Sequence, residues 1–235
     1  MTNAANPIAV AIDESDLGVA QSLVQKLAGD VGWLKLGMEF FFAQGRSGYE
    51  RLARLGLPVF LDLKLHDIPN SVAGALNSLM RLDPAPGIVN VHASGGRAMM
   101  EAAADAVGGR AKLIAVTVLT SLEENDLAEI GFGKRSSADH ALGLAKLAKS
   151  AGLDGVVCSP HDVAQIKAAL GRDFLAIVPG VRPEGSGAGD QKRMATPGTA
   201  RKAGADLLVI GRPITRAKDP RAAARAIAKD VMDAG

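Results

Sequence analysis

Apolar residues along the chain follow two alternating spacings. Short apolar segments, many with every second residue hydrophobic, are typical of strands, and each precedes a longer segment with the three-and-four spacing of helices. The expected strands cover residues 8–13, 33–37, 60–64, 88–92, 113–119, 155–158, 174–178 and 207–210. The expected helices cover residues 16–27, 39–55, 69–82, 97–107, 137–150, 160–170, 196–203 and 220–233, with a short additional helix near 126–130.

The order of these elements predicts an α/β fold. Roughly eight strand–helix units in 235 residues have the count and order of a single (β/α)₈ TIM barrel, and no linker or change in composition divides residues 1–235. Gly45 and Gly48 weaken the middle of one expected helix, and Asp16 suits the N-cap of the first. The alternative is an open doubly wound sheet, although no G-x-G-x-x-G follows the first strand.

Charged residues concentrate where the first three strands end. Asp62 and Lys64 are two apart in FLDLKLHDIPNSV, so they share one face of a strand, and Asp67 follows just past its end. Asp13 ends the first strand and Lys35 lies in the second. A single such pair is usually a structural salt bridge. Five charges that face inward are costly to bury unless they serve a purpose, so we expect a functional cluster at this end of the barrel.

A second polar group follows the last two strands, where barrels of this kind often bind phosphate. Gly211 and Arg212 come directly after the eighth strand, and Arg182 begins a long connection after the seventh. Glycine allows a backbone N–H to approach an oxyanion closely, and arginine can bind it with two hydrogen bonds. The connection, residues 179–193, has four glycines and no hydrophobic period, so we expect a mobile, phosphate-gripping loop. It closes with Gln191, Lys192 and Arg193.

Composition excludes several classes of protein. The net charge is +2, from 27 basic and 25 acidic residues, which does not suggest a nucleic-acid or membrane-surface protein. The single Cys158 excludes an internal disulfide and favours the cytoplasm, and the N-terminus lacks the features of a signal peptide. The four histidines are scattered without metal-ligand spacing, so no metal site is expected. The roles of His66 and His92 stay open.

Several motifs together resemble one known family. The segment FLDLKLHDIPNSV resembles the D-x-K-x-x-D-I-P-N signature of orotidine 5′-phosphate decarboxylases. The segments AIDES, WLKLG, VTVLTS, VPGVRP and VIGRPIT resemble the family's other strand-end motifs, in the family's order and over nearly the whole chain. One position differs, because Ser71 stands where the signature usually has Thr, and this change keeps the hydroxyl.

The resemblance implies a carboxy-lyase that converts orotidine 5′-phosphate to uridine 5′-phosphate, the last step of de novo UMP synthesis, without metal or cofactor. Lys64 would protonate C6 of the pyrimidine, and Asp62 would lie against the substrate carboxylate. Lys35 and Asp67 would complete the catalytic array. The implied substrate contacts are Asp13 and Lys35 at the ribose, Thr120 at the pyrimidine, and Arg182, Gln191, Gly211 and Arg212 at the phosphate. The enzyme would be a homodimer in which Asp67, Ile68 and Ser71 serve the neighbouring site.

Two alternatives differ from this interpretation. The first is a related Mg²⁺-dependent sugar-phosphate decarboxylase or hexulose-phosphate synthase, a class that also carries D-x-K-x-x-D. Those barrels have Glu on the second strand where this chain has Lys35, whose charge would repel the metal. The second is a non-catalytic phosphate-binding barrel, which would have no need of a concentrated charge array.

Overall fold

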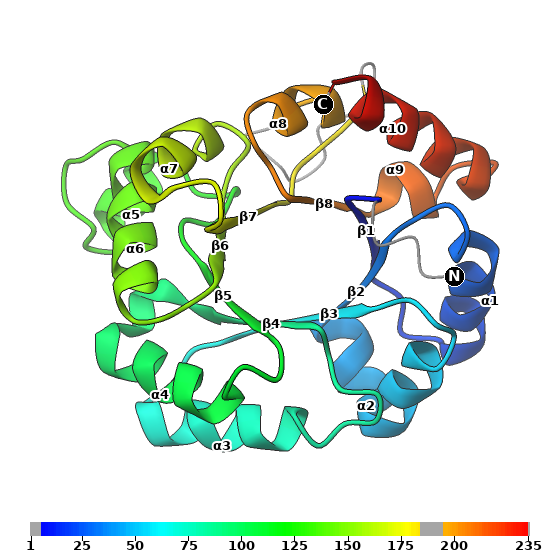
Figure 1. The fold of residues 1–235 in the computed structure, drawn as a ribbon, viewed down its shortest axis with the longest axis horizontal. Coiled ribbons are helices and arrows are strands. Elements are labelled where there is room, and N and C mark those ends of the chain that lie inside the picture. Colours follow the sequence, from blue (N-terminus) through cyan, green and yellow to red (C-terminus); the bar gives the residue numbers. More distant parts are fainter. Residues whose placement is uncertain (1–5, 184–194, 235) are drawn as a thin grey trace.

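Eight parallel strands close into a barrel in the computed structural model, which describes residues 6–183 and 195–234 (Figure 1). Neighbours in sequence are neighbours in the barrel, and the last strand pairs with the first. This topology confirms the predicted (β/α)₈ fold. The strands are β1 (Ile8–Ile12), β2 (Trp33–Gly37), β3 (Val59–Leu65), β4 (Ile88–His92), β5 (Lys112–Val116), β6 (Gly155–Val157), β7 (Leu175–Val178) and β8 (Leu207–Ile210).

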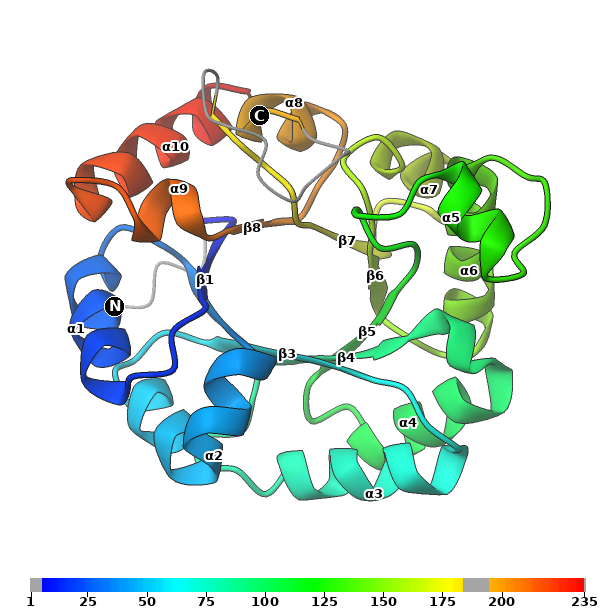
Figure 2. The same cartoon turned by 180° about the vertical axis from the view of Figure 1, so that it is seen from behind.

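Helices surround the barrel, as the view from behind also shows (Figure 2). They are α1 (Leu17–Leu27), α2 (Met38–Ala53), α3 (Pro69–Leu79), the 3₁₀ helix η1 (Ala93–Gly95), α4 (Arg97–Val107), α5 (Glu124–Glu129), α6 (Ser137–Ser150), α7 (Val163–Leu170), α8 (Pro197–Lys202), α9 (Arg212–Thr215) and α10 (Pro220–Ala234). Within the described part of the chain, none of these helices is long and apolar enough to span a bilayer.

The strands bury both of their faces, each in a different hydrophobic layer. Ile8, Val10 and Ile12 belong to the large core between barrel and helices. Ala9 lies in the smaller cluster inside the barrel, whose other buried members are Phe60, Ile88, Ile114, Ile177 and Leu207. The period-two alternation of the sequence therefore separates the barrel interior from the outer core.

Most element boundaries agree with the sequence prediction, and the exceptions have local causes. The strand expected to reach residue 119 ends at Val116, after which the chain turns to form part of a pocket wall. The helix expected from residue 160 starts at Val163, because a turn in which the Asp162 amide donates to the Ser159 carbonyl (3.0 Å) comes first. Helix α2 is kinked at Gly45, where φ is 59°.

Candidate active site

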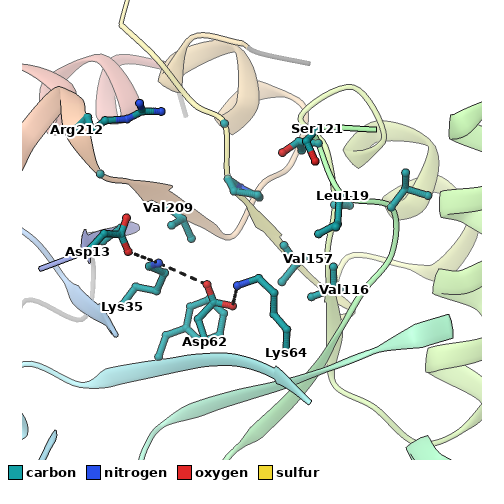
Figure 3. Close-up of a pocket in the computed structure, with 18 of the residues that line it drawn as sticks. Asp13, Lys35, Asp62, Lys64, Val116, Leu119, Ser121, Val157, Val209 and Arg212 are labelled. Atoms are coloured by element: carbon teal, nitrogen blue, oxygen red, sulfur yellow. Dashed lines mark hydrogen bonds and ion pairs between the residues drawn. The ribbon is translucent and has the colours of Figure 1, made fainter. Parts of the chain in front are cut away.

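A pocket of about 340 Å³ lies at the C-terminal end of the barrel (Figure 3). Its walls come from the ends of β1, β2, β3 and β8 and from the segments that follow β5, β6 and β7. This is the end of a (β/α)₈ barrel at which ligands bind. Eight residues that the sequence singled out line it: Asp13, Lys35, Asp62, Lys64, Thr120, Arg182, Gly211 and Arg212.

Four charged side chains form a continuous, alternating row across three adjacent strands (Figure 3). The Lys35 Nζ atom lies 3.1 Å from Asp13 Oδ1 and 3.5 Å from Asp62 Oδ2. The Lys64 Nζ atom lies 2.8 Å from Asp62 Oδ1. The order along the row is therefore Asp13, Lys35, Asp62, Lys64, with each inner charge between two charges of opposite sign.

Burial differs along this row. The side chains of Lys35 and Asp62 are 9% and 11% exposed, whereas Lys64 is more open and Asp13 is the most exposed. Burial opposes the ionisation of Asp62, but the charges of Lys35 and Lys64, with hydrogen bonds from Lys64 and Asn90, outweigh it and lower its pKa. A permanent negative charge at Asp62 thus sits beside an accessible ammonium.

The main chain at Lys64 departs from regular strand geometry. Lys64 has a φ of 53°, the only positive φ among the described non-glycine residues. The pairing of β3 with β4 shifts between Leu61, opposite Val89, and Leu65, opposite Val91, so the strand bulges at Lys64. This bulge lets Lys64 reach the pocket from the end of the strand.

Asn90 is a site residue that the sequence analysis missed. It lies in the middle of β4, almost completely buried, and its Nδ2 atom donates to Asp62 Oδ1 at 2.7 Å. Its Oδ1 atom accepts from the Lys64 main-chain N–H at 2.8 Å. The signal was present in the sequence, because an amide at an inward position of the apolar segment IVNVH requires a polar partner.

A second set of polar groups lines the pocket away from this row. Gly211 precedes α9 directly, and Figure 3 shows Arg212 and Lys64 at separate ends of the pocket. The main chain of Arg182 donates to the Ala195 carbonyl at 3.0 Å, which joins the two sides of the connection after β7. Gln191 lies outside the described residues, as does most of the expected loop at 179–193.

Three predicted site residues lie outside this pocket. Asp67, Ile68 and Ser71 are exposed and are not among the lining residues. The Asp67 carboxylate accepts from the Ile68 main-chain N–H at 2.6 Å. The expectation that all five charges face inward is therefore wrong for Asp67, because β3 ends at Leu65 and the chain turns outward toward α3.

Two histidines pack together near the charged row. The ring centroids of His66 and His92 are 5.5 Å apart, and neither residue lines the pocket. Burial lowers the pKa of His92, and the charges of His66 and Lys64 act in the same direction against a weaker opposing effect of Asp62. Among the described residues, no group of three or more His, Cys, Asp or Glu side chains is arranged to hold a metal ion.

A closed barrel with a charged pocket at its C-terminal end is the arrangement of a (β/α)₈-barrel enzyme. More specifically, the chain belongs to the orotidine 5′-phosphate decarboxylase / HUMPS family, whose sequence model matches residues 6–227.

Named relatives agree with this assignment. The chain is 56% identical over 222 residues to orotidine 5′-phosphate decarboxylase of Novosphingobium aromaticivorans, covering 94% of this chain and 97% of the relative. It is 53% identical, with the same coverage, to the protein of that name from Erythrobacter litoralis. The crystal structure of orotidine 5′-phosphate decarboxylase from Lactobacillus acidophilus is similar, with a TM-score of 0.84 and 37% identity over 96% of this chain and 99% of that one.

Proposed function

We propose that this protein decarboxylates orotidine 5′-phosphate to uridine 5′-phosphate and CO₂, the last step of UMP synthesis, without a metal or cofactor. The observation that carries the proposal is the Lys64 ammonium, 2.8 Å from the ionised Asp62 in the pocket. The names and high identities of the relatives support the same substrate.

Lys64 is the proton donor. When the bond between C6 and the carboxylate breaks, CO₂ leaves and the electron pair remains on C6, where no π-system can delocalise it. The Lys64 ammonium stabilises this developing charge and transfers a proton to C6, so the product carries a new C–H bond. The lysine, then neutral, regains a proton from solvent.

Asp62 acts on the leaving carboxylate. The charges of Lys35 and Lys64 favour its ionised form, so a bound substrate brings a second negative charge close to it. This repulsion is present in the bound substrate and ends once neutral CO₂ departs, which lowers the barrier relative to the ground state. Lys35 keeps Asp62 in place and, with Asp13, binds the ribose hydroxyls.

The phosphate is bound far from the bond that breaks. Arg182, Gly211 and Arg212 supply cationic and main-chain contacts to it, with Gln191 from the connection after β7. Thr120 faces the pyrimidine from the segment after β5. Binding energy from this remote group can be used to assemble the site around the reacting carboxylate.

The active unit is a homodimer in the cytoplasm. In this dimer, the substrate in the partner's pocket is contacted by Asp67, Ile68 and Ser71. These three residues are exposed and do not line the pocket of their own chain, in keeping with such a role. Large exposed apolar side chains support an interface at this end of the barrel. Phe42 is 76% exposed near the start of α2, and Ile68 is 67% exposed just before α3, so both follow adjacent strands.

A Mg²⁺-dependent reaction of the hexulose-phosphate type is the competing function within the same family. The position of Lys35 opposes it, because this ammonium lies between the Asp13 and Asp62 carboxylates at 3.1 and 3.5 Å. A divalent cation held by those two carboxylates would be repelled by the lysine.

The test is an incubation with orotidine 5′-phosphate in the presence of EDTA, following the absorbance change of the pyrimidine and identifying the product. We expect uridine 5′-phosphate to form at a rate that the chelator does not change. Absence of turnover would contradict the proposal. Metal-dependent turnover of a hexulose phosphate in its place would support the competing function.

A further inference from the structure

A single amide connects the two most important groups of the charged row. Asn90 is 1% exposed, and both ends of its side chain are used, one on the carboxylate of Asp62 and one on the main chain of Lys64. Asn90 does not line the pocket, so its effect on a ligand must pass through these two residues.

The main chain that Asn90 holds is strained. A positive φ is unfavourable for a residue with a Cβ, and it persists only where the surroundings compensate for it. At Lys64, the bulge in β3 takes the N–H out of the regular pairing with β4. The Asn90 Oδ1 atom accepts this N–H at 2.8 Å and thereby stabilises the conformation from which the lysine side chain leaves the strand.

The other end of the amide fixes the partner of the lysine. Asp62 Oδ1 accepts from both Asn90 Nδ2, at 2.7 Å, and Lys64 Nζ, at 2.8 Å. Asp62 Oδ2 lies 3.5 Å from Lys35 Nζ, so each carboxylate oxygen has a defined partner. The amide therefore sets the carboxylate and the lysine main chain relative to one another.

We propose that Asn90 is a positioning residue of this site: it fixes the Asp62 carboxylate and the main-chain bend that directs the Lys64 ammonium into the pocket. The inference rests on the decarboxylase function proposed above. With Asn90, a residue of β4 supports a charged row that otherwise comes from the ends of β1, β2 and β3.

The first test compares Asn90→Ala with Asn6→Ala. Asn6 is a matched control, because it too is a buried amide that uses both ends of its side chain. It donates to the Asp30 main-chain carbonyl (3.0 Å) and accepts from the Ile8 main-chain N–H (3.1 Å). It precedes β1, at the opposite end of the barrel. We expect Asn90→Ala to lower kcat about 100-fold, the size of effect a misplaced group causes. KM should stay within a few-fold, and Asn6→Ala should lower Tm while kcat is retained.

The second test uses Asn90→Asp, which keeps the acceptor for the Lys64 N–H but donates to Asp62 only when the new carboxyl is protonated. We expect kcat relative to the wild type to rise as the pH falls, whereas Asn90→Ala shows no such rise. The ionisable groups around this position are Asp62 and Lys64, with Lys35, His66 and His92 nearby, and β5 presents Ile114 at the paired position. The wild type and Asn90→Ala are measured over the same pH range as references.

Wild-type kcat in both folded Asn90 variants would overturn the positioning role, as would equal losses of kcat in Asn90→Ala and Asn6→Ala. If Asn90→Ala does not fold, the pH profile of Asn90→Asp decides, and a profile parallel to the wild type contradicts the proposal. A wild-type enzyme that fails to turn over orotidine 5′-phosphate would instead contradict the proposed function. The two failures are therefore distinguishable.

Discussion

Asp62 shows how single residues are tuned by their neighbours in this pocket. It is buried, which disfavours its charge, yet two lysines and Asn90 surround it and lower its pKa. Its protonated form is therefore not populated near neutral pH. A buried charge of this kind depends on its partners, because removing one of them leaves an uncompensated carboxylate.

Arg212 is predicted to act on the phosphate alone. Arg212→Ala should lower kcat/KM for the phosphorylated substrate by roughly 100-fold or more, since a charge-assisted contact is lost, and should scarcely change any reaction of the phosphate-free nucleoside. Arg216→Ala is the matched control, because Arg216 is exposed one turn further along and does not line the pocket. Equal losses of kcat/KM on both substrates would contradict a role of Arg212 in binding the phosphate.

His92 should make stability depend on pH. Its pKa is lowered in the folded protein, so below about 6.5 the unfolded chain binds more protons than the folded one. The stability contribution of neutral His92 is complete above that pH and is lost as the pH falls. Between pH 7 and pH 5, we expect the Tm of His92→Gln to fall less than the Tm of the wild type. The exposed His161→Gln should behave like the wild type, and identical losses in all three proteins would contradict the assignment.

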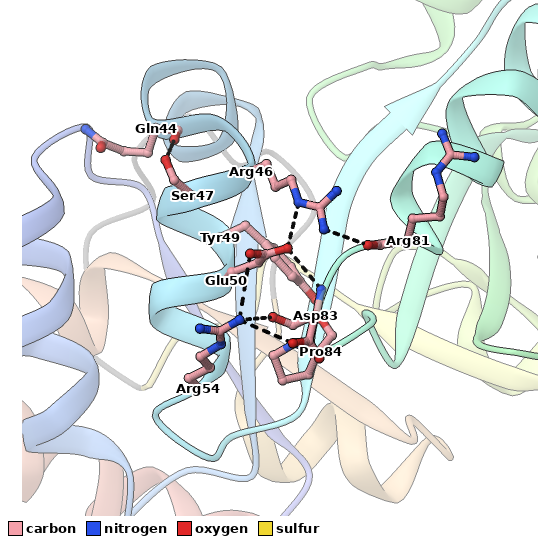
Figure 4. Close-up of polar contacts among 9 residues, drawn as sticks. All are labelled: Gln44, Arg46, Ser47, Tyr49, Glu50, Arg54, Arg81, Asp83 and Pro84. Atoms are coloured by element: carbon pink, nitrogen blue, oxygen red, sulfur yellow. Dashed lines mark hydrogen bonds and ion pairs between the residues drawn. The ribbon is translucent and has the colours of Figure 1, made fainter.

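Helix α2 is tied to the connection between α3 and β4 by a compact polar network (Figure 4). The Glu50 carboxylate accepts from Arg46 Nε at 2.8 Å and from the Asp83 main-chain N–H at 3.1 Å. Beside it, the buried Tyr49 hydroxyl donates to the Pro84 carbonyl at 3.1 Å. Burial raises the pKa of Tyr49, with the Glu50 charge acting in the same direction, so the hydroxyl stays protonated.

Tyr49→Phe tests this connection between elements. The substitution keeps the ring but leaves the Pro84 carbonyl without its donor, which should lower the free energy of unfolding by about 1 kcal/mol. Urea unfolding measures the change. Phe41→Leu, on the same helix outside the network, controls for altered ring packing. An unchanged urea midpoint in Tyr49→Phe would show that the hydroxyl does not help to hold α2 against the connection between α3 and β4.

Sequence pattern was most informative for elements whose structure is decided locally. The alternation in residues 8–12 located the two faces of β1, and Asp16 caps α1 through a 2.8 Å bond to the Val19 main chain, as predicted. The helix α9 was not predicted, because it has only four residues and no period of its own. The position at which β5 ends depends on its pairing with neighbouring strands, and the hydrophobic pattern of a single segment contains no information on that pairing.

The candidate site could be predicted because (β/α)₈ barrels place their functional groups at the C-terminal ends of the strands. Asp13, Lys35 and the pair Asp62 and Lys64 come from three separate segments, and strand order alone brings these segments together. The bend at Lys64 was not predictable, since it depends on a bulge against β4. The inward orientation expected for Asp67 was wrong because strand alternation does not continue beyond the last paired residue, whereas its role at a neighbouring site stays a prediction.

At the scale of the whole molecule, the proposed homodimer would share each site between its subunits through Asp67. Lys64→Ala and Asp67→Ala should each be inactive, yet a mixture allowed to exchange subunits should regain activity. A mixed dimer has one site with both defects and one with neither. Random pairing makes half of the dimers mixed, so activity should approach about a quarter of the wild type by two-fold symmetry.

The result depends on verified subunit exchange, which differently tagged chains would establish. If Asp67 instead serves its own chain, every site in the mixture keeps one defect. Persistent inactivity after complete exchange would then exclude the shared site, whereas the pocket described within one chain would be unaffected.

The most direct test of the whole account compares decarboxylation of orotidine 5′-phosphate by the wild type and by Lys64→Ala, under saturating substrate and with EDTA present. Lys112→Ala is the control, because it removes a lysine paired with Asp154 at the opposite end of the barrel. We predict that Lys64→Ala folds normally by circular dichroism and loses kcat by several orders of magnitude, since the proton donor and its charge are both gone. Near-normal turnover by folded Lys64→Ala would contradict the account.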